Sequence, residues 1–306
     1  PAQFEGPSGK DRLAKILVMR EFARRPTRLN SLETMGLVAV QYPKLDTLVL
    51  RPVAVENAGL TLQEWKSFLK IALDFFVRAN TFIELPDSWR KWGGNRIASK
   101  LLLNPESIEK QTSRLKRWPQ CNTGFGQNRL VRMLAYVLNL DSKSDVGRDR
   151  IDSILRAAWD DLVKIDLLRA GGNGRFLSLE DTAFAPITAA WVCPVTRRIL
   201  DTTFRGVTPY LPSSAVTPAV AECRAIEIPL SYLSKGASFV SDVERVNAIR
   251  GWADANETVR TLRHGLWSDL SDRIIEGGAY FRSVEHSAQQ TGARLQEYER
   301  EFKEGY

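Results

Sequence analysis

The stretch IDLLRAGGNGRFLSLED, residues 165–181, gives the strongest indication of the fold. Two short apolar runs flank Gly171–Gly174, where glycine and asparagine adopt positive φ at little cost, so the stretch predicts a β-hairpin. Apolar residues at helical spacing predict one helix around 130–137 and a second around 151–162. Two helices followed by a glycine-rich hairpin are typical of a winged helix, which we predict over residues 107–190 with the hairpin as its wing.

The N-terminal side of this unit is predicted to be mainly helical. The capping box TLQE, residues 61–64, opens a helix that extends to about residue 80. We expect LVAVQYP, residues 37–43, to form a strand that pairs with LDTLVLRPVAV, residues 45–55. A further helix is expected to carry a basic group that ends near Trp118. Residues 1–106 are therefore predicted to be a helical region with a short strand pair. The predicted basic helix falls in the next segment, residues 107–190. The basic group comprises Lys110, Arg114, Lys116 and Arg117.

The C-terminal side divides into a connector and a last helical segment. The run AWVCPVTRRILDTTFRGVTPYLP, residues 190–212, lacks a helical period and is rich in threonine, so it predicts a β-containing connector over 191–230. Residues 231–306 are predicted to be helical, and they end with FRSVEHSAQQTGARLQEYEREFKEG, residues 281–305. This stretch has the pattern of a strand and an amphipathic helix without the strand that would return beside them.

Composition limits the classes of function. The chain of 306 residues has a formal net charge of +7 and a pI of about 9.4, which modestly favours nucleic acid as a partner. No apolar run reaches the ~18 residues of a membrane helix, so we expect a soluble, cytoplasmic protein with no membrane partner. Cys121, Cys193 and Cys223 show no paired spacing, and therefore no metal site is predicted. No phosphate-binding loop or catalytic motif occurs, so no cofactor and no catalytic residue is predicted in this chain.

Arginines near the predicted second helix, the wing and the connector are the candidate DNA-binding residues, because guanidinium groups neutralise and chelate phosphates. The alternative is that the winged helix packs against protein and that these arginines are solvated or paired with Asp149, Asp152, Asp160 and Asp161. The candidates are Arg148, Arg150, Arg156, Arg175, Arg197, Arg198 and Arg205.

Four segments together resemble the large DEAD/DEAH-box superfamily 2 helicases of bacteria, most closely those of antiphage defence systems such as Druantia and DISARM, with relatives in DNA repair. The segments are LNSLETMGLVAVQYP, IALDFFVRANTFIELPDSWRKW, AWVCPVTRRILDTTFRGVTPYLP and residues 281–305. The resemblance implies that residues 281–305 belong to the second RecA-like lobe of a motor. The strand that should follow them, the arginine-finger motif and the ATP-binding lobe are absent from this sequence.

The sequence thus predicts a mainly helical α+β chain that contains a winged helix, a connector and an incomplete RecA-like edge. The expected role is that of an accessory, DNA-engaging segment of an ATP-dependent DNA helicase or translocase. ATP and magnesium would bind the remaining lobes of the motor, which are expected as partners beside DNA. The alternatives are a non-enzymatic winged-helix subunit that binds protein, and a DNA-binding regulator.

Overall fold

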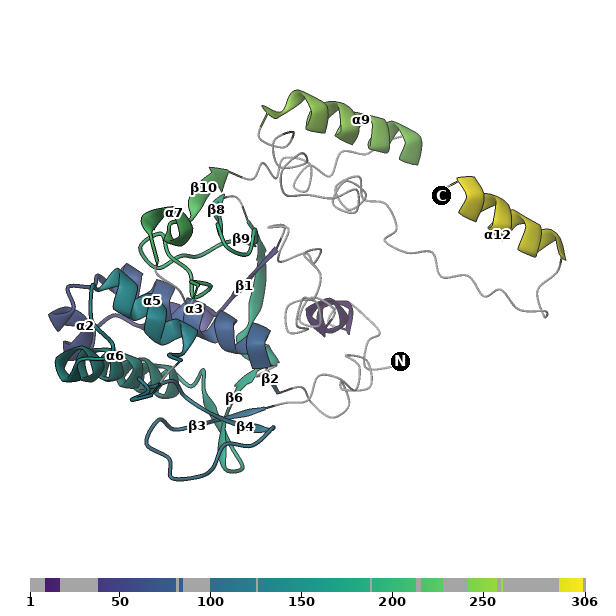
Figure 1. The fold of residues 1–306 in the computed structure, drawn as a ribbon. Coiled ribbons are helices and arrows are strands. Elements are labelled where there is room, and N and C mark those ends of the chain that lie inside the picture. The colour runs from purple at the N-terminus through teal and green to yellow at the C-terminus, as the bar shows by residue number, and fades with distance from the viewer. Residues whose placement is uncertain are drawn as a thin grey trace.

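The chain folds as an α+β protein with three small sheets, and most of its described elements gather into one packed body (Figure 1). Two helices, α9 (Asp242–Ala255) and α12 (Gly292–Glu304), lie apart from that body in the same view. The computed structural model describes residues 9–16, 38–80, 83–84, 100–124, 126–187, 189–212, 216–227, 241–257, 260 and 292–304.

Three helices form the centre of the body, and each was predicted from the sequence. Helix α3 (Leu62–Asn80) starts at the predicted capping box: the Thr61 amide donates to Glu64 Oε2 at 2.7 Å, and the Glu64 amide donates to Thr61 Oγ1 at 3.2 Å. Helix α5 (Arg129–Val137) is capped by the side chain of Asn128, and α6 (Asp145–Lys164) by that of Ser144. Their apolar stripes face one another and form most of the core.

The predicted hairpin is present as β5 (Arg169–Gly171) and β6 (Gly174–Ser178), which pair antiparallel. Gly172 adopts φ of 52° in the turn. A side chain at Gly174 would collide with the next strand, because a Cβ there would lie 2.8 Å from the carbonyl oxygen of Leu102. Glycine therefore serves both the turn and the close approach to the neighbouring strand.

The hairpin extends into a larger mixed sheet. Strand β6 pairs antiparallel with β3 (Leu101–Leu103), β3 pairs parallel with β4 (Leu115–Arg117), and the end of β6 pairs parallel with β2 (Ile83–Glu84). Strand β6 therefore lies between β5 on one side and β3 on the other.

Ion pairs hold the base of the hairpin. Arg169 of β5 contacts the nearly buried carboxylate of Asp181 at 2.8 Å, and Lys44 reaches the same carboxylate at 2.9 Å. In β6, the Arg175 guanidinium donates to the carbonyl oxygen of Leu168 at 2.9 Å. These contacts join the hairpin to the segment around Lys44, far away in the sequence.

Two further sheets lie on the other side of the body. Strand β1 (Val38–Gln41) pairs antiparallel with β7 (Ala183–Pro186). Strand β8 (Ala189–Val192) is central in a three-stranded sheet, flanked by β9 (Ile199–Leu200) and β10 (Arg224–Glu227). The connector is thus rich in strands, as the sequence predicted.

Two predicted elements are wrong. Residues 45–55 do not form a strand beside β1; they contain the 3-10 helix η2 (Pro43–Thr47) and the short helix α2 (Val53–Asn57). Pro43 and Pro52 stand at the starts of these helices, where a fixed φ and a missing N–H favour a helical first turn.

The predicted basic helix near Trp118 is also absent. Lys110 and Arg114 lie in a loop, and Lys116 and Arg117 lie on β4. Thr112 Oγ1 accepts hydrogen bonds from the amides of Arg114 and Leu115, and such local bonds compete with helix formation.

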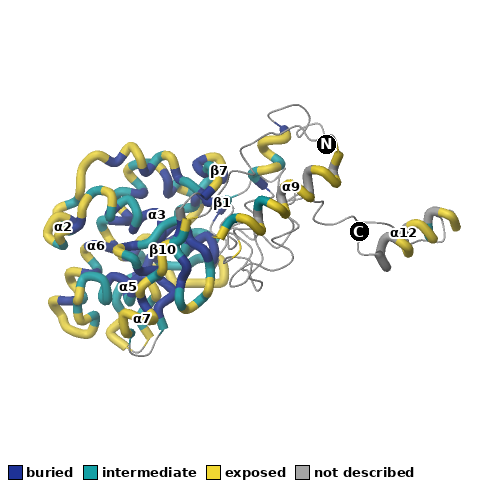
Figure 2. Tube along the Cα trace, turned by 90° about the horizontal axis from the view of Figure 1, so that it is seen from above, coloured by how far each residue is buried: buried dark blue, intermediate teal, exposed yellow. Residues whose placement is uncertain are grey.

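A single large group of buried apolar residues runs from Ile16 to Ala221 and includes residues on both sides of the predicted boundary at 106/107. Figure 2 shows these buried residues gathered inside the packed body. Trp118 lies at the centre: its ring stacks on Phe76 at 5.0 Å, meets Trp159 edge-on at 5.7 Å, and its N–H donates to the Leu155 carbonyl at 2.7 Å. The segments 1–106 and 107–190 thus share a core.

A charged network is buried along α3. Lys70 Nζ lies 2.8 Å from Asp74 Oδ2 and 3.0 Å from Asp201 Oδ2, while Tyr42 donates to Asp74 at 2.9 Å. Arg78 approaches the same Asp74 carboxylate at 3.6 Å. Burial alone would lower the pKa of Lys70, but Asp74 and Asp201 raise it above its ordinary value. Because Asp201 follows β9, the network fastens the connector to α3.

Helices α9 and α12 confirm the helical pattern predicted for these parts of the C-terminal segment. The strand expected before α12, within residues 281–291, lies outside the described residues. The RecA-like edge therefore stays a prediction.

Candidate functional site

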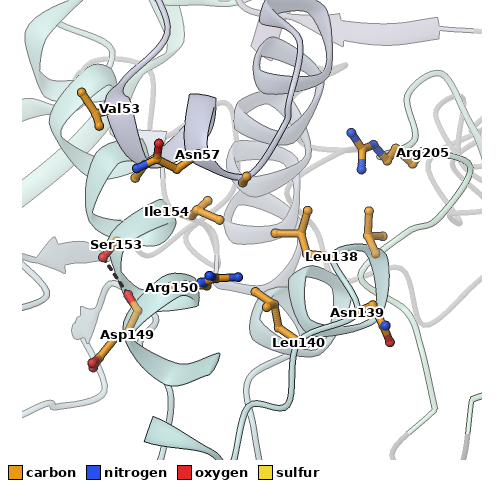
Figure 3. Close-up of a pocket in the computed structure, with 13 residues that line it drawn as sticks. Val53, Asn57, Leu138, Asn139, Leu140, Asp149, Arg150, Ser153, Ile154 and Arg205 are labelled. Atoms are coloured by element: carbon orange, nitrogen blue, oxygen red, sulfur yellow. Dashed lines mark hydrogen bonds between the residues drawn. The ribbon is translucent and has the colours of Figure 1, made fainter. Parts of the chain in front are cut away.

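The candidate site is an open groove of about 830 Å³ on the surface of the packed body. Three parts of the fold form its walls: α2, the turn that follows α5, and the N-terminal half of α6 (Figure 3). Its apolar lining includes Val53, Leu138, Leu140 and Ile154.

Two predicted arginines, Arg150 and Arg205, line this groove. Figure 3 shows them on opposite sides of it, with Leu138 between them. Arg150 projects from α6 and is exposed, and it makes no ion pair or hydrogen bond within the described residues. Arg205 contacts Glu64 Oε1 at 2.6 Å and donates to the Gly59 carbonyl at 3.0 Å. Of the two arginines, Arg150 is therefore the one that offers an unpaired charge to the groove.

The pairing with Arg205 changes the acidity of Glu64. The hydrogen bond from the guanidinium is the main cause, and the amide and hydroxyl of Thr61 add to it, so the pKa of Glu64 falls to about 2 although burial opposes the change. Glu64 thus closes the capping box of α3 and ties down Arg205 at the same time.

Exposed apolar side chains lie beside the groove. Val49, Leu50 and Val53 are 75%, 75% and 71% exposed, although they lie within five residues of one another. Val53 also lines the groove. A group of large apolar side chains this exposed is typical of a surface that contacts another molecule.

The other arginines on or beside α6 and the hairpin have partners within the chain. Arg148 pairs with Asp145 and donates to the Lys143 carbonyl, and Arg156 pairs with Glu106 at 3.0 Å with both side chains exposed. The Arg175 guanidinium donates to the carbonyl oxygen of Leu168, just before β5. A phosphate would have to compete with these internal contacts.

The exposed face of α6 has balanced charge. It carries three carboxylates and three cations, so the face has no net charge at neutral pH. A uniformly cationic helix is what strong phosphate binding favours, and α6 lacks that pattern. The exposed residues are Asp145, Val146, Asp149, Arg150, Ser153, Arg156, Asp160 and Lys164.

The other two predicted arginines of the connector, Arg197 and Arg198, are not among the residues that line the groove. Arg197 is exposed in the turn after β8, with φ of 59° and no side-chain contact within the described residues. Arg198 lies over the ring of Tyr210, 5.3 Å from its centroid, and donates to its hydroxyl at 3.3 Å. The structure thus places Arg198 beside an aromatic side chain of the same connector.

Sequence reasoning missed two further arginines at this point. Arg129 lies 5.8 Å from the centroid of the same Tyr210 ring, and Arg132 is close enough to Arg129 for the two charges to repel. Burial, and then this repulsion, lower the pKa of Arg132. The signal was present in the sequence, because both arginines fall in the first turns of a helix that has no acidic residue there.

Two thiols pack under Tyr210. Cys193 and Cys223 belong to the same small buried cluster as Tyr210, and Cys193 Sγ lies 3.5 Å from Thr208 Oγ1. Hydrogen bonds from Cys223, Thr196 and Thr208 lower the pKa of Cys193, although burial opposes them. Both cysteines are free.

Among the residues that the structure describes, no group of three or more histidine, cysteine, aspartate or glutamate side chains could hold a metal ion. Over the same residues, no helix combines the length and apolar character needed to cross a membrane. In comparisons with known proteins, no family model, curated protein or solved structure matched the chain.

Proposed function

We propose that the chain is a DNA-engaging accessory segment of an ATP-dependent DNA helicase or translocase, built around a winged-helix unit. The order of its main elements carries this proposal: helix α3, strand β3, helices α5 and α6, then the hairpin β5–β6, with β6 lying between β5 and β3. A winged helix has this order, to which the chain adds β2 before β3 and β4 after it, both in the same sheet. In a helix-turn-helix unit the second helix is the one that enters a DNA groove.

In this proposal α6 takes the place of the recognition helix and the β5–β6 hairpin that of the wing. The net charge of +7 supports a polyanionic ligand. Arg150 and Arg197 are the predicted contacts whose side chains are unpaired within the described residues, so they would reach phosphates without breaking internal bonds. Arg148, Arg156, Arg175, Arg198 and Arg205 would have to exchange or share their present partners.

The helicase part of the proposal rests on the sequence resemblance. Nucleotide and magnesium would bind the remaining motor lobes, and this chain would position DNA beside them, in phage defence or DNA repair. The isolated chain should therefore show no ATP hydrolysis. DNA-stimulated turnover by the chain alone would contradict its role as an accessory segment.

DNA binding is tested by titrating the purified chain with a fluorescently labelled duplex at several salt concentrations. We expect binding at low salt, with log K falling by about 0.9 per neutralised phosphate as log salt rises. Failure to bind any duplex or single-stranded DNA at low salt would end the proposal.

Because the exposed face of α6 carries both charges in equal number, substitutions there can be designed either to weaken or to strengthen DNA binding. If this face meets phosphates, Arg150→Glu with Arg156→Glu should weaken binding, whereas Asp149→Asn with Asp160→Asn should strengthen it. The second pair is the matched control, because it alters the same face and removes negative charge. If neither pair changes the affinity, α6 does not contact DNA.

The groove supports a second candidate function, that of a protein-binding subunit. Val53 and the unpaired Arg150 line the groove, and Val49 and Leu50 are exposed shortly before Val53 in the chain, which would suit an acidic peptide with an apolar side chain that enters the groove. Isothermal titration with a partner motor lobe should then show binding that both Val53→Asp and Arg150→Glu weaken. Binding that survives both substitutions would place the partner elsewhere.

A further inference from the structure

Two arginines, Arg129 and Arg198, lie against the ring of Tyr210, and a third, Arg132, is close enough to Arg129 for their charges to repel. Arg129 and Arg132 come from the first turns of α5, and Arg198 comes from the residue before β9. The Tyr210 ring lies within 6 Å of the guanidinium carbons of Arg129 and Arg198, and the ring itself is only 7% exposed. Segments more than 60 residues apart thus bring their cations to one place.

No carboxylate neutralises this cluster. None of the three arginines forms an ion pair within the part of the chain that the structure describes. The Nε atom of Arg132 is buried and lacks a hydrogen-bond partner. Arg150 and Arg197 are also unpaired within the described residues, but here three arginines without a carboxylate come together.

Folding stability does not explain the arrangement. Arg129 and Arg132 lie in the first turns of α5, where cations oppose the positive end of the helix dipole. Like charges placed side by side add repulsion. Tyr210 is the neutral partner of Arg129 and Arg198, and no carboxylate of the described residues faces the cluster, so an external anion would supply the missing opposite charge.

We propose that Arg129, Arg132 and Arg198 form a binding site for the phosphodiester backbone of nucleic acid. Arginine suits this role because its planar fork of donors matches the oxygens of a phosphate. Tyr210 is too buried to stack on a base, so it acts as a platform that holds two of the guanidinium groups. The site therefore binds without reading the base sequence.

This inference rests on the proposed DNA-binding function but names a different surface from α6. Arg198 was among the predicted contacts, whereas Arg129 and Arg132 were not. Arg197, exposed and next to Arg198, would extend the site along the connector.

The test compares two triple variants of the full chain by anisotropy with the same labelled duplex and with a single strand of the same sequence. One variant carries Arg129→Gln, Arg132→Gln and Arg198→Gln. The matched control carries Lys110→Gln, Arg114→Gln and Lys116→Gln, which remove the same net charge from another surface. Because the first variant should neutralise about three fewer phosphates, its slope of log K against log salt should become shallower by about 2.7 on duplex.

The control variant should keep most of the wild-type slope. If the slope of log K against log salt becomes shallower by the same amount in both variants, net charge alone governs binding and the proposed site is refuted. If the wild-type chain binds DNA and the first variant keeps its slope, the inference fails while the proposed function stands. If the wild-type chain binds no DNA at all, both fail. Thermal unfolding of each variant confirms that a reduced slope does not come from unfolded protein.

Discussion

The packed body contains two groups of charged residues that are arranged in opposite ways. In the network on α3, each cation is paired with a carboxylate and the side chains are at most 12% exposed. The network comprises Lys70, Asp74, Arg78 and Asp201, and Tyr42 donates a hydrogen bond to Asp74. At the start of α5, the cluster of Arg129, Arg132 and Arg198 has cations alone.

This difference suggests different roles for the two groups: the paired charges stabilise the fold, and the unpaired cations bind a ligand. A buried charge is tolerated when partners of the opposite sign satisfy it, and removal of one partner then leaves the other exposed to a low dielectric. A cation cluster near the surface keeps part of its hydration and needs no internal partner. The first group should therefore respond to mutation with lost stability, and the second with lost binding.

The largest loss of stability is expected for Asp74→Ala. The substitution removes the Asp74 carboxylate from both Arg78 and Lys70, so the free energy of unfolding should fall by about 3 to 5 kcal/mol. Urea denaturation measures the change. Asp201→Asn is the control and should cost less, because Lys70 keeps Asp74 at 2.8 Å. Equal losses of stability for the two variants would show that Asp74 does not contact both Lys70 and Arg78 as it does in the structure.

An intermediate effect is expected for Glu64→Gln, which weakens an ion pair near the surface and one side of a capping box. The loss should be about 1 to 2 kcal/mol at neutral pH. Because the pKa of Glu64 is lowered from 4.5 to about 2, its contribution is complete above about pH 5 and is lost as the pH falls through 2. The free energies of unfolding of wild type and Glu64→Gln, measured by urea denaturation, should therefore converge as the pH is lowered from about 5 to about 2.

The matched control for Glu64 is Glu56→Gln. Its pair with Arg51 is longer, at 3.5 Å, and both side chains are well exposed, so the change should be close to zero. If the difference in the free energy of unfolding between wild type and Glu64→Gln stays constant down to pH 2, the ion pair between Arg205 and Glu64 does not form in solution.

The smallest effect, and one of opposite sign, is expected for Arg129→Gln with Arg132→Gln. Removal of two cations from the start of α5 should leave stability unchanged or raise it by up to about 1 kcal/mol per charge. The melting temperature measures this directly. A marked destabilisation would mean that the cluster has a structural role and would remove the contrast with the network on α3.

Local signals in the sequence were sufficient for much of the fold. The capping box at Thr61, the apolar spacing of α5 and α6, and the Gly171–Gly174 turn each depend on residues close together in the chain. The pairing of β1 with β7 and of β3 with β6 joins residues more than 70 positions apart, and no local pattern specifies such partners.

The candidate sites were predictable only in part, for the same reason. Arg150 and Arg205 were named from their own neighbourhoods, but nothing in the sequence indicated that they would face one groove. Arg129 and Arg132 were missed because they gain meaning only beside Tyr210 and Arg198. The absence of an acidic residue at the start of α5 was the one local sign.

The ion pairs at the base of the β5–β6 hairpin have a consequence for the thermodynamics of binding. Arg169 and Lys44 share the carboxylate of Asp181, and the two strands pair fully with each other. The conformational entropy of this segment is therefore lost during folding and not when a ligand arrives. A ligand that docks on the hairpin meets a rigid surface, so the heat capacity change of association would reflect the buried area alone.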